Sequence, residues 1–199
     1  YGHLSENIAN KIVHYRLSGV ITFLAPTSKA SEVLKNNNIP VVLVGRDGKL
    51  TETSSVFSKD YQGGKIAAEN LLALNGKEFC YITEHAELNI DSQRCNGFKN
   101  YLIKQGVNNK NIHVIIGNLE VNAMKELEKL VAKTKIDSIF CFSDLIAYSV
   151  IEKLTELNIK VPKDINVIGY DNLQDYIPYP LKVSSIDNCK HKMVSEALD

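Results

Sequence analysis

Two polar residues that could bind a ligand stand directly after two apolar stretches of the chain. Ser143 follows residues 138–142, and Asp171 follows residues 165–170. A serine hydroxyl both donates and accepts hydrogen bonds, whereas an ionised carboxylate only accepts them. No nucleophile-base pair can be placed in the sequence, so these residue types favour ligand binding over covalent chemistry.

The two apolar stretches are predicted to be parallel strands joined by a helix. Apolar side chains recur at helical spacing over residues 145–157, Asp144 can cap this helix, and Pro162 ends the helical region. Parallel strands require such a crossover, and their carboxyl ends meet at one edge of the sheet. Open α/β sheets bind ligands at that edge. The sequence therefore predicts a binding site that includes Ser143 and Asp171.

The same alternation of strands and helices continues through the rest of the chain. Further strands are predicted at residues 20–24, 39–44, 55–57, 79–83, 112–116 and 183–186. Further helices are predicted at residues 5–17, 65–74 and 121–131, from 28 or 31 to 35, from 91 or 92 to 105, and from 187 or 188 onwards. This pattern indicates an α/β fold with parallel sheets covered by helices on both faces. Because a doubly wound sheet normally begins with a strand, we expect this fold to be truncated at both ends.

Composition narrows the class of protein. The chain has 199 residues, 44% of them hydrophobic, and 23 basic residues balance 23 acidic ones. It can therefore bury a core, but it lacks the basic character of a DNA-binding surface. No apolar run approaches the roughly 20 residues that span a bilayer, so we expect no membrane contact.

Motifs for metals and cofactors are missing from the sequence. The four cysteines are Cys80, Cys95, Cys141 and Cys189. They form no CxxC pair, and the five histidines form no HExxH pair, which predicts core thiols in a reduced, cytoplasmic protein and no metal site. There is also no G-x-G-x-x-G, Walker A or G-x-S-x-G sequence. We therefore expect no cofactor and no enzymatic activity.

Five separate motifs resemble one known family and occur in its order from residue 5 to residue 199. They are GVITFLAPTS, NIPVVLVGR, GGKIAAENLLALNG, SQRCNGFKNYLIKQG, and SDLIAYSVIEKLTELNIKVPKDINVIGYDN with the later PLKVSSID. These motifs closely resemble the effector-binding domain of the lactose-repressor and ribose-binding-protein family, which is of the periplasmic-binding-protein-like type.

The resemblance implies two doubly wound parallel-sheet subdomains of the flavodoxin-like kind, with a ligand in the cleft between them. The N-terminal subdomain would comprise residues 1–76 and 181–199, and the C-terminal subdomain residues 77–180. The turn at Asn75-Gly76 and the proline-rich connector around Pro178 stand at these boundaries.

The resemblance also implies which residues bind the ligand. Arg46 and Arg94 match family arginines that face the cleft, Asp171 matches an acidic residue that accepts ligand hydroxyls, and Asn188 stands at an amide-bearing position. Ser143 replaces the usual asparagine. Guanidinium donors, a carboxylate acceptor and an amide are suited to a polyhydroxylated ligand in a solvated cleft.

Two further departures from the family pattern concern the ligand's identity. Leu119 stands near the place where relatives often stack an aromatic ring, and Lys59-Asp60 replaces a frequent Asp-Asn pair ahead of Gly63-Gly64. They leave the identity of the ligand open, but not the location of the site.

Each candidate residue also has a structural alternative. Arg94 could hold a surface ion pair, and Arg46 could be solvated beside Asp47. Asp144 and Asn188 could cap helices. Asp171 could cap the turn that follows its strand. Tyr170, Tyr176 and Tyr179 are expected to pack rather than to stack on a ligand.

Three functions are compatible with this sequence. The first is the effector-binding domain of a transcriptional regulator, in which a sugar or related molecule changes the DNA affinity of a helix-turn-helix headpiece outside this chain. Family members of this type are cytoplasmic homodimers that bind operator DNA. The second is an extracytoplasmic sugar-binding protein of a transporter. The third, an enzyme on a flavodoxin-like fold, has no support beyond the fold.

Overall fold

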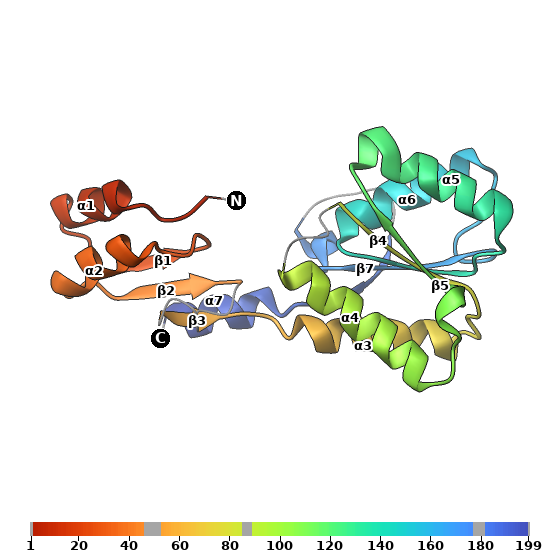
Figure 1. Ribbon diagram of the computed structural model, residues 1–199, viewed down its shortest axis with the longest axis horizontal. Coiled ribbons are helices and arrows are strands. Elements are labelled where there is room, and N and C mark those ends of the chain that lie inside the picture. Colours follow the sequence, from red (N-terminus) through yellow and green to blue (C-terminus); the bar gives the residue numbers. More distant parts are fainter. Residues whose placement is uncertain (1, 46–52, 85–88, 177–181, 199) are drawn as a thin grey trace. The chain divides into compact units, whose positions relative to one another are not determined.

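The computed structural model describes residues 2–45, 53–84, 89–176 and 182–198. The chain forms two compact units. Unit 1 comprises Tyr1–Ser58 and Cys189–Asp199, and unit 2 comprises Lys59–Asn188. Figure 1 shows the helices and strands of both units and labels many of them.

Unit 1 contains a parallel sheet of three strands in the order β1-β2-β3. The strands are β1 (Val20–Thr22), β2 (Val41–Val44) and β3 (Ser54–Val56), and the helices are α1 (Glu6–His14), α2 (Ser28–Asn36) and α7 (Lys190–Leu198). Ser5 caps α1 by accepting a hydrogen bond of 3.4 Å from the backbone N–H of Ile8. Helices α1 and α2 share a small apolar core of Leu4, Ala9, Ile12, Ala30 and Leu34.

Unit 2 contains a parallel sheet of five strands in the order β5-β4-β6-β7-β8. The strands are β4 (Phe79–Thr83), β5 (Ile112–Ile116), β6 (Ser138–Cys141), β7 (Asn166–Tyr170) and β8 (Ser184–Ile186). The long helices are α3 (Asp60–Ala73), α4 (Asn89–Lys104), α5 (Met124–Lys133) and α6 (Asp144–Glu156), and short helical turns occur at Asn109–Asn111, Leu119–Ala123 and Leu173–Asp175. The predicted α/β class with two parallel sheets is thereby confirmed. Numbered along unit 2, the strand order is 2-1-3-4-5, which is the flavodoxin-like order.

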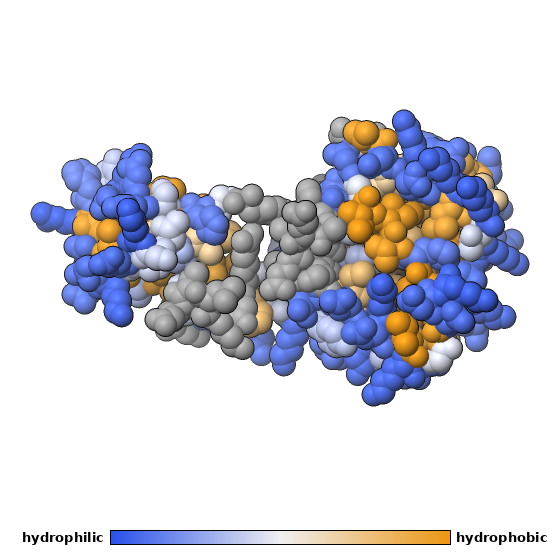
Figure 2. Space-filling model, viewed as in Figure 1, coloured by the Kyte–Doolittle hydropathy of each residue, from blue (hydrophilic) through white to orange (hydrophobic). Residues whose placement is uncertain are grey.

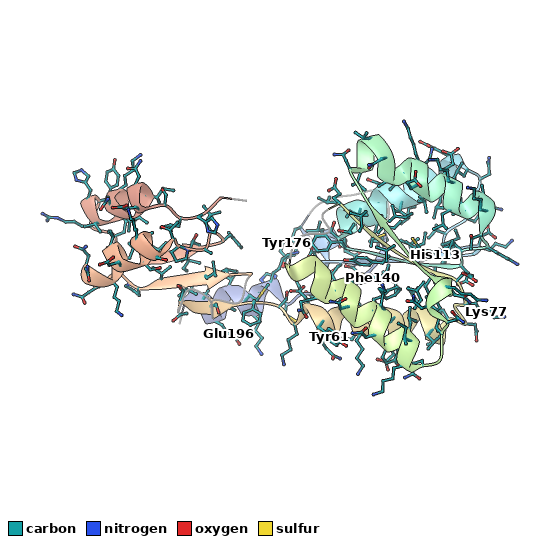
Figure 3. The ribbon with its side chains drawn as sticks, viewed as in Figure 1. Tyr61, Lys77, His113, Phe140, Tyr176 and Glu196 are labelled. Atoms are coloured by element: carbon teal, nitrogen blue, oxygen red, sulfur yellow. The ribbon has the colours of Figure 1, made fainter. Side chains whose placement is uncertain are left out.

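Helices cover both faces of the unit 2 sheet, α3 and α4 on one side and α5 and α6 on the other (Figure 1). An aromatic group fills the layer under α3 and α4: the ring of Phe140, labelled in Figure 3, lies 5.3 Å from the rings of both Tyr81 and Phe98. The opposite layer is aliphatic and includes the buried thiols of Cys80 and Cys141. Strands buried on both faces explain why these sequences are continuous apolar runs.

Helices α3 and α4 pack closely because glycines stand at their contact. A Cβ atom at Gly64 would overlap the carbonyl group of Arg94, and one at Gly97 would overlap the carbonyl group of Tyr61. The sequence predicts the helix only from residue 65, after Gly63-Gly64, but α3 begins at Asp60 and contains both glycines. The glycines therefore bring α4 close to α3 and fix the backbone that carries Arg94.

The observed units differ from the predicted subdomains at both edges. Residues of α3 belong to unit 2 because this helix packs on α4, and β8 belongs to unit 2 because Ser184, Ser185 and Ile186 pair with β7. The chain therefore passes between the units at residues 58–59 and 188–189, rather than after residue 76 and at residue 181.

Candidate ligand-binding site

Arg94 of α4 is held by three oxygen atoms within unit 2. Its Nε atom lies 2.8 Å from Oδ1 of Asp60, and its Nη1 atom donates a hydrogen bond of 2.6 Å to the carbonyl oxygen of Phe142. Its Nη2 atom lies 3.5 Å from Oδ1 of Asp171. Arg94 is only 5% exposed. The ion pair that the sequence allowed as an alternative role of Arg94 therefore exists, but it is buried rather than at the surface.

Two aromatic rings fix the plane of the Arg94 guanidinium. Its Cζ atom lies 3.5 Å from the ring centroid of Tyr170 and 4.5 Å from that of Phe142. An arginine stacks well on aromatic faces because its charge is delocalised over a planar group. Tyr170 is thus a packing residue, as expected, and its packing partner is the arginine itself.

The hydroxyl of Tyr170 is tied to the same cluster. Burial raises the pKa of Tyr170, and the carboxylate of Asp60, which also forms a side-chain hydrogen bond with it, raises the pKa further. The guanidinium of Arg94 acts in the opposite direction. The phenol therefore stays protonated and remains hydrogen-bonded to Asp60.

This cluster lies where the strand order of the unit 2 sheet reverses. Strands β4 and β6 are neighbours, α4 follows β4, and Phe142 follows β6. The crevice outside the carboxyl ends of two such strands is the usual ligand site of an open α/β sheet. The fold therefore brings Arg94 to the expected edge.

Asp171 and Asn188 meet at the same edge, after β7 and β8. The Nδ2 atom of Asn188 donates a hydrogen bond of 2.8 Å to Oδ1 of Asp171. Asp171 has a φ of 97°, which is rare for a residue with a side chain, and its side chain is 21% exposed. The Oδ1 atom of Asn188 is buried and has no hydrogen-bond partner among the residues that the structure describes. A buried acceptor without a donor is unfavourable unless a ligand or water supplies one.

The cluster offers a defined set of hydrogen-bonding positions. An arginine has five N–H donors, and the three contacts of Arg94 leave two of them without a partner in the described parts of the chain. Asn188 contributes an acceptor, and the carboxylate of Asp171 is partly open to solvent. One cation stands against two carboxylates, so these described side chains carry net negative charge. The arrangement can bind and orient a molecule with several hydroxyl groups.

Ser143, rather than Asp144, caps helix α6. The hydroxyl of Ser143 caps α6 by accepting a hydrogen bond of 3.4 Å from the backbone N–H of Ile146. The capping role predicted for Asp144 is therefore wrong, because its carboxylate accepts hydrogen bonds from Ser185 and Leu173 instead. Ser143 still lies one residue after Phe142, beside the arginine cluster.

The structure brings together three of the five predicted ligand residues, namely Arg94, Asp171 and Asn188. Arg46 lies outside the described residues. Sequence reasoning named Asp60 only as part of a departure from the family pattern and did not include it among the ligand residues, although its position three residues before Gly63 places it on the same face of α3. It also missed Phe142, whose contribution to the cluster includes a backbone carbonyl that no sequence motif specifies.

Neither a metal-binding cluster nor a membrane-spanning helix occurs in the same described residues. No group of three or more His, Cys, Asp or Glu side chains there could hold a metal ion. None of the helices in those ranges combines the length and apolar character needed to cross a membrane.

The fold and the site define a class of α/β binding domain, and comparison with known proteins gives its family. Residues 19–182 match the family described as periplasmic binding protein domain. The chain belongs to this family. The resemblance inferred from the five motifs is confirmed, because the relatives of this chain include repressors and regulators of the lactose-repressor type.

One such relative is the HTH-type transcriptional repressor PurR of Actinobacillus pleuropneumoniae serotype 3, which is 24% identical over 197 residues. The match covers 98% of this chain but only 59% of that repressor. Two solved structures of transcriptional regulators are also similar to this chain.

Both solved structures share the fold at low identity. A LacI-family regulator from Enterococcus faecium with bound ribose has a TM-score of 0.79 at 18% identity, over 96% of this chain and 72% of that one. A LacI regulator from a Rhodococcus species has a TM-score of 0.78 at 23% identity, over 98% and 73% of the two chains.

Proposed function

We propose that this chain is the effector-binding part of a transcriptional regulator of the lactose-repressor family, and that its effector is a neutral polyhydroxylated molecule such as a sugar. The observation that carries the proposal is the cluster of Arg94, Asp171 and Asn188. A hydroxyl group donates to the buried Oδ1 atom of Asn188, a second one donates to Asp171, and their oxygens accept from Arg94.

The charge of the cluster favours a neutral ligand over an anionic one. Asp60 and Asp171 outweigh the single positive charge of Arg94. A phosphate or carboxylate would add a negative charge beside these described side chains, which already carry one in excess, and this is unfavourable where the dielectric is low. The ribose bound to the Enterococcus faecium regulator is a neutral ligand of the same chemical class.

The regulatory part of the proposal follows from the relatives. The repressors to which this chain is similar are of the HTH type, and the chain spans 59% of the length of one of them. A helix-turn-helix headpiece outside these 199 residues would bind operator DNA in the cytoplasm. The effector changes the DNA affinity only if it binds two conformations of the protein with different affinity.

A homodimer is part of the same proposal. Exposed apolar side chains on unit 2 support it, among them Val121 with 64% and Leu145 with 54% of their surface exposed. Figure 2 shows that apolar side chains also gather at the surface of this unit. Surfaces of this kind commonly mark contacts between protein subunits.

The experiment measures how sugars change the affinity of the full-length protein for DNA from its own promoter region, by fluorescence anisotropy. D-ribose and a panel of neutral pentoses and hexoses are compared with ribose 5-phosphate. The proposal predicts that a neutral sugar changes the DNA affinity and that the phosphate ester does not. An effect of the phosphate ester alone would overturn the neutral-ligand proposal.

Matched variants locate the effect. Asn188→Ala should abolish the response to the sugar, because it removes both the amide donor and the open acceptor. Asn70→Ala is the control, since Asn70 is exposed and bonds only to a carbonyl of its own helix. A sugar-binding protein of a transporter would bind the sugar without binding promoter DNA, and that outcome would replace the regulator proposal.

A further inference from the structure

The backbone after β7 adopts a conformation that requires support. Asp171 has a φ of 97° and Asn172 a φ of 48°, so two consecutive residues with side chains lie in the left-handed region. Such residues cost free energy and persist only where the surrounding structure holds them. Because Asp171 is one of the proposed effector contacts, the groups that hold this turn control where its carboxylate lies.

A half-buried chain of hydrogen bonds holds the turn. The backbone N–H of Asn172 donates to Oγ of Ser185 over 2.9 Å, and the same hydroxyl donates to Oδ1 of Asp144 over 2.6 Å. The other carboxylate oxygen of Asp144 accepts a hydrogen bond of 2.7 Å from the backbone N–H of Leu173. Two successive N–H groups of the turn are therefore bound by a serine of β8 and an aspartate of α6.

The sequence around Asp144 keeps its carboxylate in place. Asp144 is fully buried, and as the first residue of α6 it lies at the positive end of the helix dipole, which favours its charge. A Cβ atom at Gly169 would overlap Oδ1 of Asp144, so only glycine lets the carboxylate lie against β7 at this point. A buried carboxylate with such specific partners has a defined geometry.

We propose that Asp144 and Ser185 are positioning residues for effector binding. Their hydrogen bonds hold Asp171 in its left-handed conformation, and this conformation places its carboxylate beside Arg94 and Asn188 before the effector arrives. Neither residue needs to touch the effector. The inference rests on the proposed function for the role of Asp171 in binding, whereas the order of the turn can be measured without any ligand.

The first measurement is amide hydrogen exchange by NMR in the ligand-free full-length protein. Ser185→Ala removes the acceptor of the Asn172 amide, and losing a net hydrogen bond of ordinary strength corresponds to exchange that is about tenfold faster. Ser185→Thr keeps the hydroxyl and should restore slow exchange. Ser184→Ala is the matched control, because Ser184 is exposed and points to the opposite face of β8.

A second readout separates positioning from a purely structural role. The side-chain amide resonances of Asn188 report its hydrogen bond to Asp171. They should shift in Ser185→Ala and in Gly169→Ala, which displaces the carboxylate of Asp144 without removing a hydrogen-bonding group. If melting temperatures fall while these resonances and the Asn172 exchange rate match those of Ser184→Ala, the positioning role is wrong.

Effector affinity completes the test. With D-ribose, or whichever neutral sugar of the panel the wild-type protein binds, calorimetry should show affinity about tenfold weaker in Ser185→Ala and restored in Ser185→Thr. Unchanged affinity in Ser185→Ala would overturn the inference. If the wild-type protein binds no neutral sugar, the proposed function fails, and the exchange and resonance measurements still decide whether Asp144 and Ser185 position Asp171.

Discussion

The Nε atom of Arg94 lies 2.8 Å from Oδ1 of Asp60, and the two side chains are only 6% and 7% exposed. The geometry of an ion pair buried to this degree matters as much as its charge. Each side chain supplies the hydrogen-bonding partner that the other cannot obtain from water. Asp60, which lies on α3, forms an ion pair with Arg94 of α4, and Asp171 faces the same arginine from the end of β7. Arg94 is therefore both a core residue of unit 2 and a proposed effector contact.

Replacing Arg94 with alanine should destabilise the protein as well as remove effector binding. The carboxylate of Asp60 would be left buried without its cation, and breaking a buried pair in this way costs roughly 3–5 kcal/mol. The measurement is urea unfolding followed by circular dichroism. Lys104→Ala provides the control, since Lys104 is exposed on the same helix and should change the free energy of unfolding by less than about 0.5 kcal/mol.

A double variant shows whether the two effects are coupled. Asp60→Asn combined with Arg94→Gln removes both charges, so it should be less destabilised than the sum of the two single variants. A coupling energy of roughly 0.5–3 kcal/mol is expected for residues in direct contact. Additive effects would mean that the interaction between the two side chains contributes little to stability beyond the packing of each side chain by itself.

Helix α3 should not tolerate alanine at Gly64, nor α4 at Gly97. Alanine favours a helix over glycine by about 1 kcal/mol, but each added methyl group would overlap a carbonyl group of the other helix. Overpacking of this kind typically costs 1–3 kcal/mol, so both variants should unfold at lower urea concentration. Gly2→Ala, where no atom lies within 4 Å of the added methyl group, should be neutral. If Gly64→Ala were as stable as the wild-type protein, the close approach of α3 and α4 would be disproved.

Stability should fall in alkaline solution because two thiols are buried in unit 2. Burial raises the pKa of Cys80 from 9.0 to about 12 and that of Cys141 well above 9.0. The unfolded chain therefore loses these protons at lower pH than the folded one, so their contribution to stability is complete below pH 9 and is lost as the pH rises from 9 towards 12.

The steepness with which the free energy of unfolding falls as the pH rises can also be measured. Each thiol lowers the free energy of unfolding by roughly 1.4 kcal/mol per pH unit in this window. Buried Tyr170 acts in the same direction at higher pH, because its pKa is also raised. Unfolding by urea between pH 8 and pH 11 should give a shallower pH dependence for Cys80→Ala than for wild type. Equal slopes in the two proteins would contradict the burial of an un-ionised thiol at this position.

Strands and helices could be predicted from the sequence because the pattern of apolar residues is strong. Residues 79–83 and 112–116 are strands within the predicted bounds, since each is an apolar run between turn signals. The start of α3 could not be predicted, because Gly63 and Gly64 resemble a helix break in sequence. Their role appears only when α4 is packed against them.

The candidate site was predicted less completely than the fold. Sequence motifs pointed to Arg94, Asp171 and Asn188, because these residues stand at positions that the family motifs specify. The partners that hold them did not follow from motifs: Phe142 contributes a backbone carbonyl, and Ser185 and Asp144 meet across 41 residues of sequence. Hydrogen bonds between distant segments depend on strand order and register, which apolar periodicity does not specify.

The Asp171→Asn variant tests the central claim most directly, by thermal unfolding with and without a neutral sugar. Asparagine tolerates the left-handed backbone at this position, so the fold should be retained. At a concentration about 100 times its dissociation constant, a bound sugar adds about 2.7 kcal/mol of stability, which raises the melting temperature by roughly 5–10 °C for a chain of this size. The account predicts this rise for at least one neutral sugar with the wild-type protein and its loss in Asp171→Asn. An equal rise in the variant, or a rise with phosphorylated sugars alone, would contradict it.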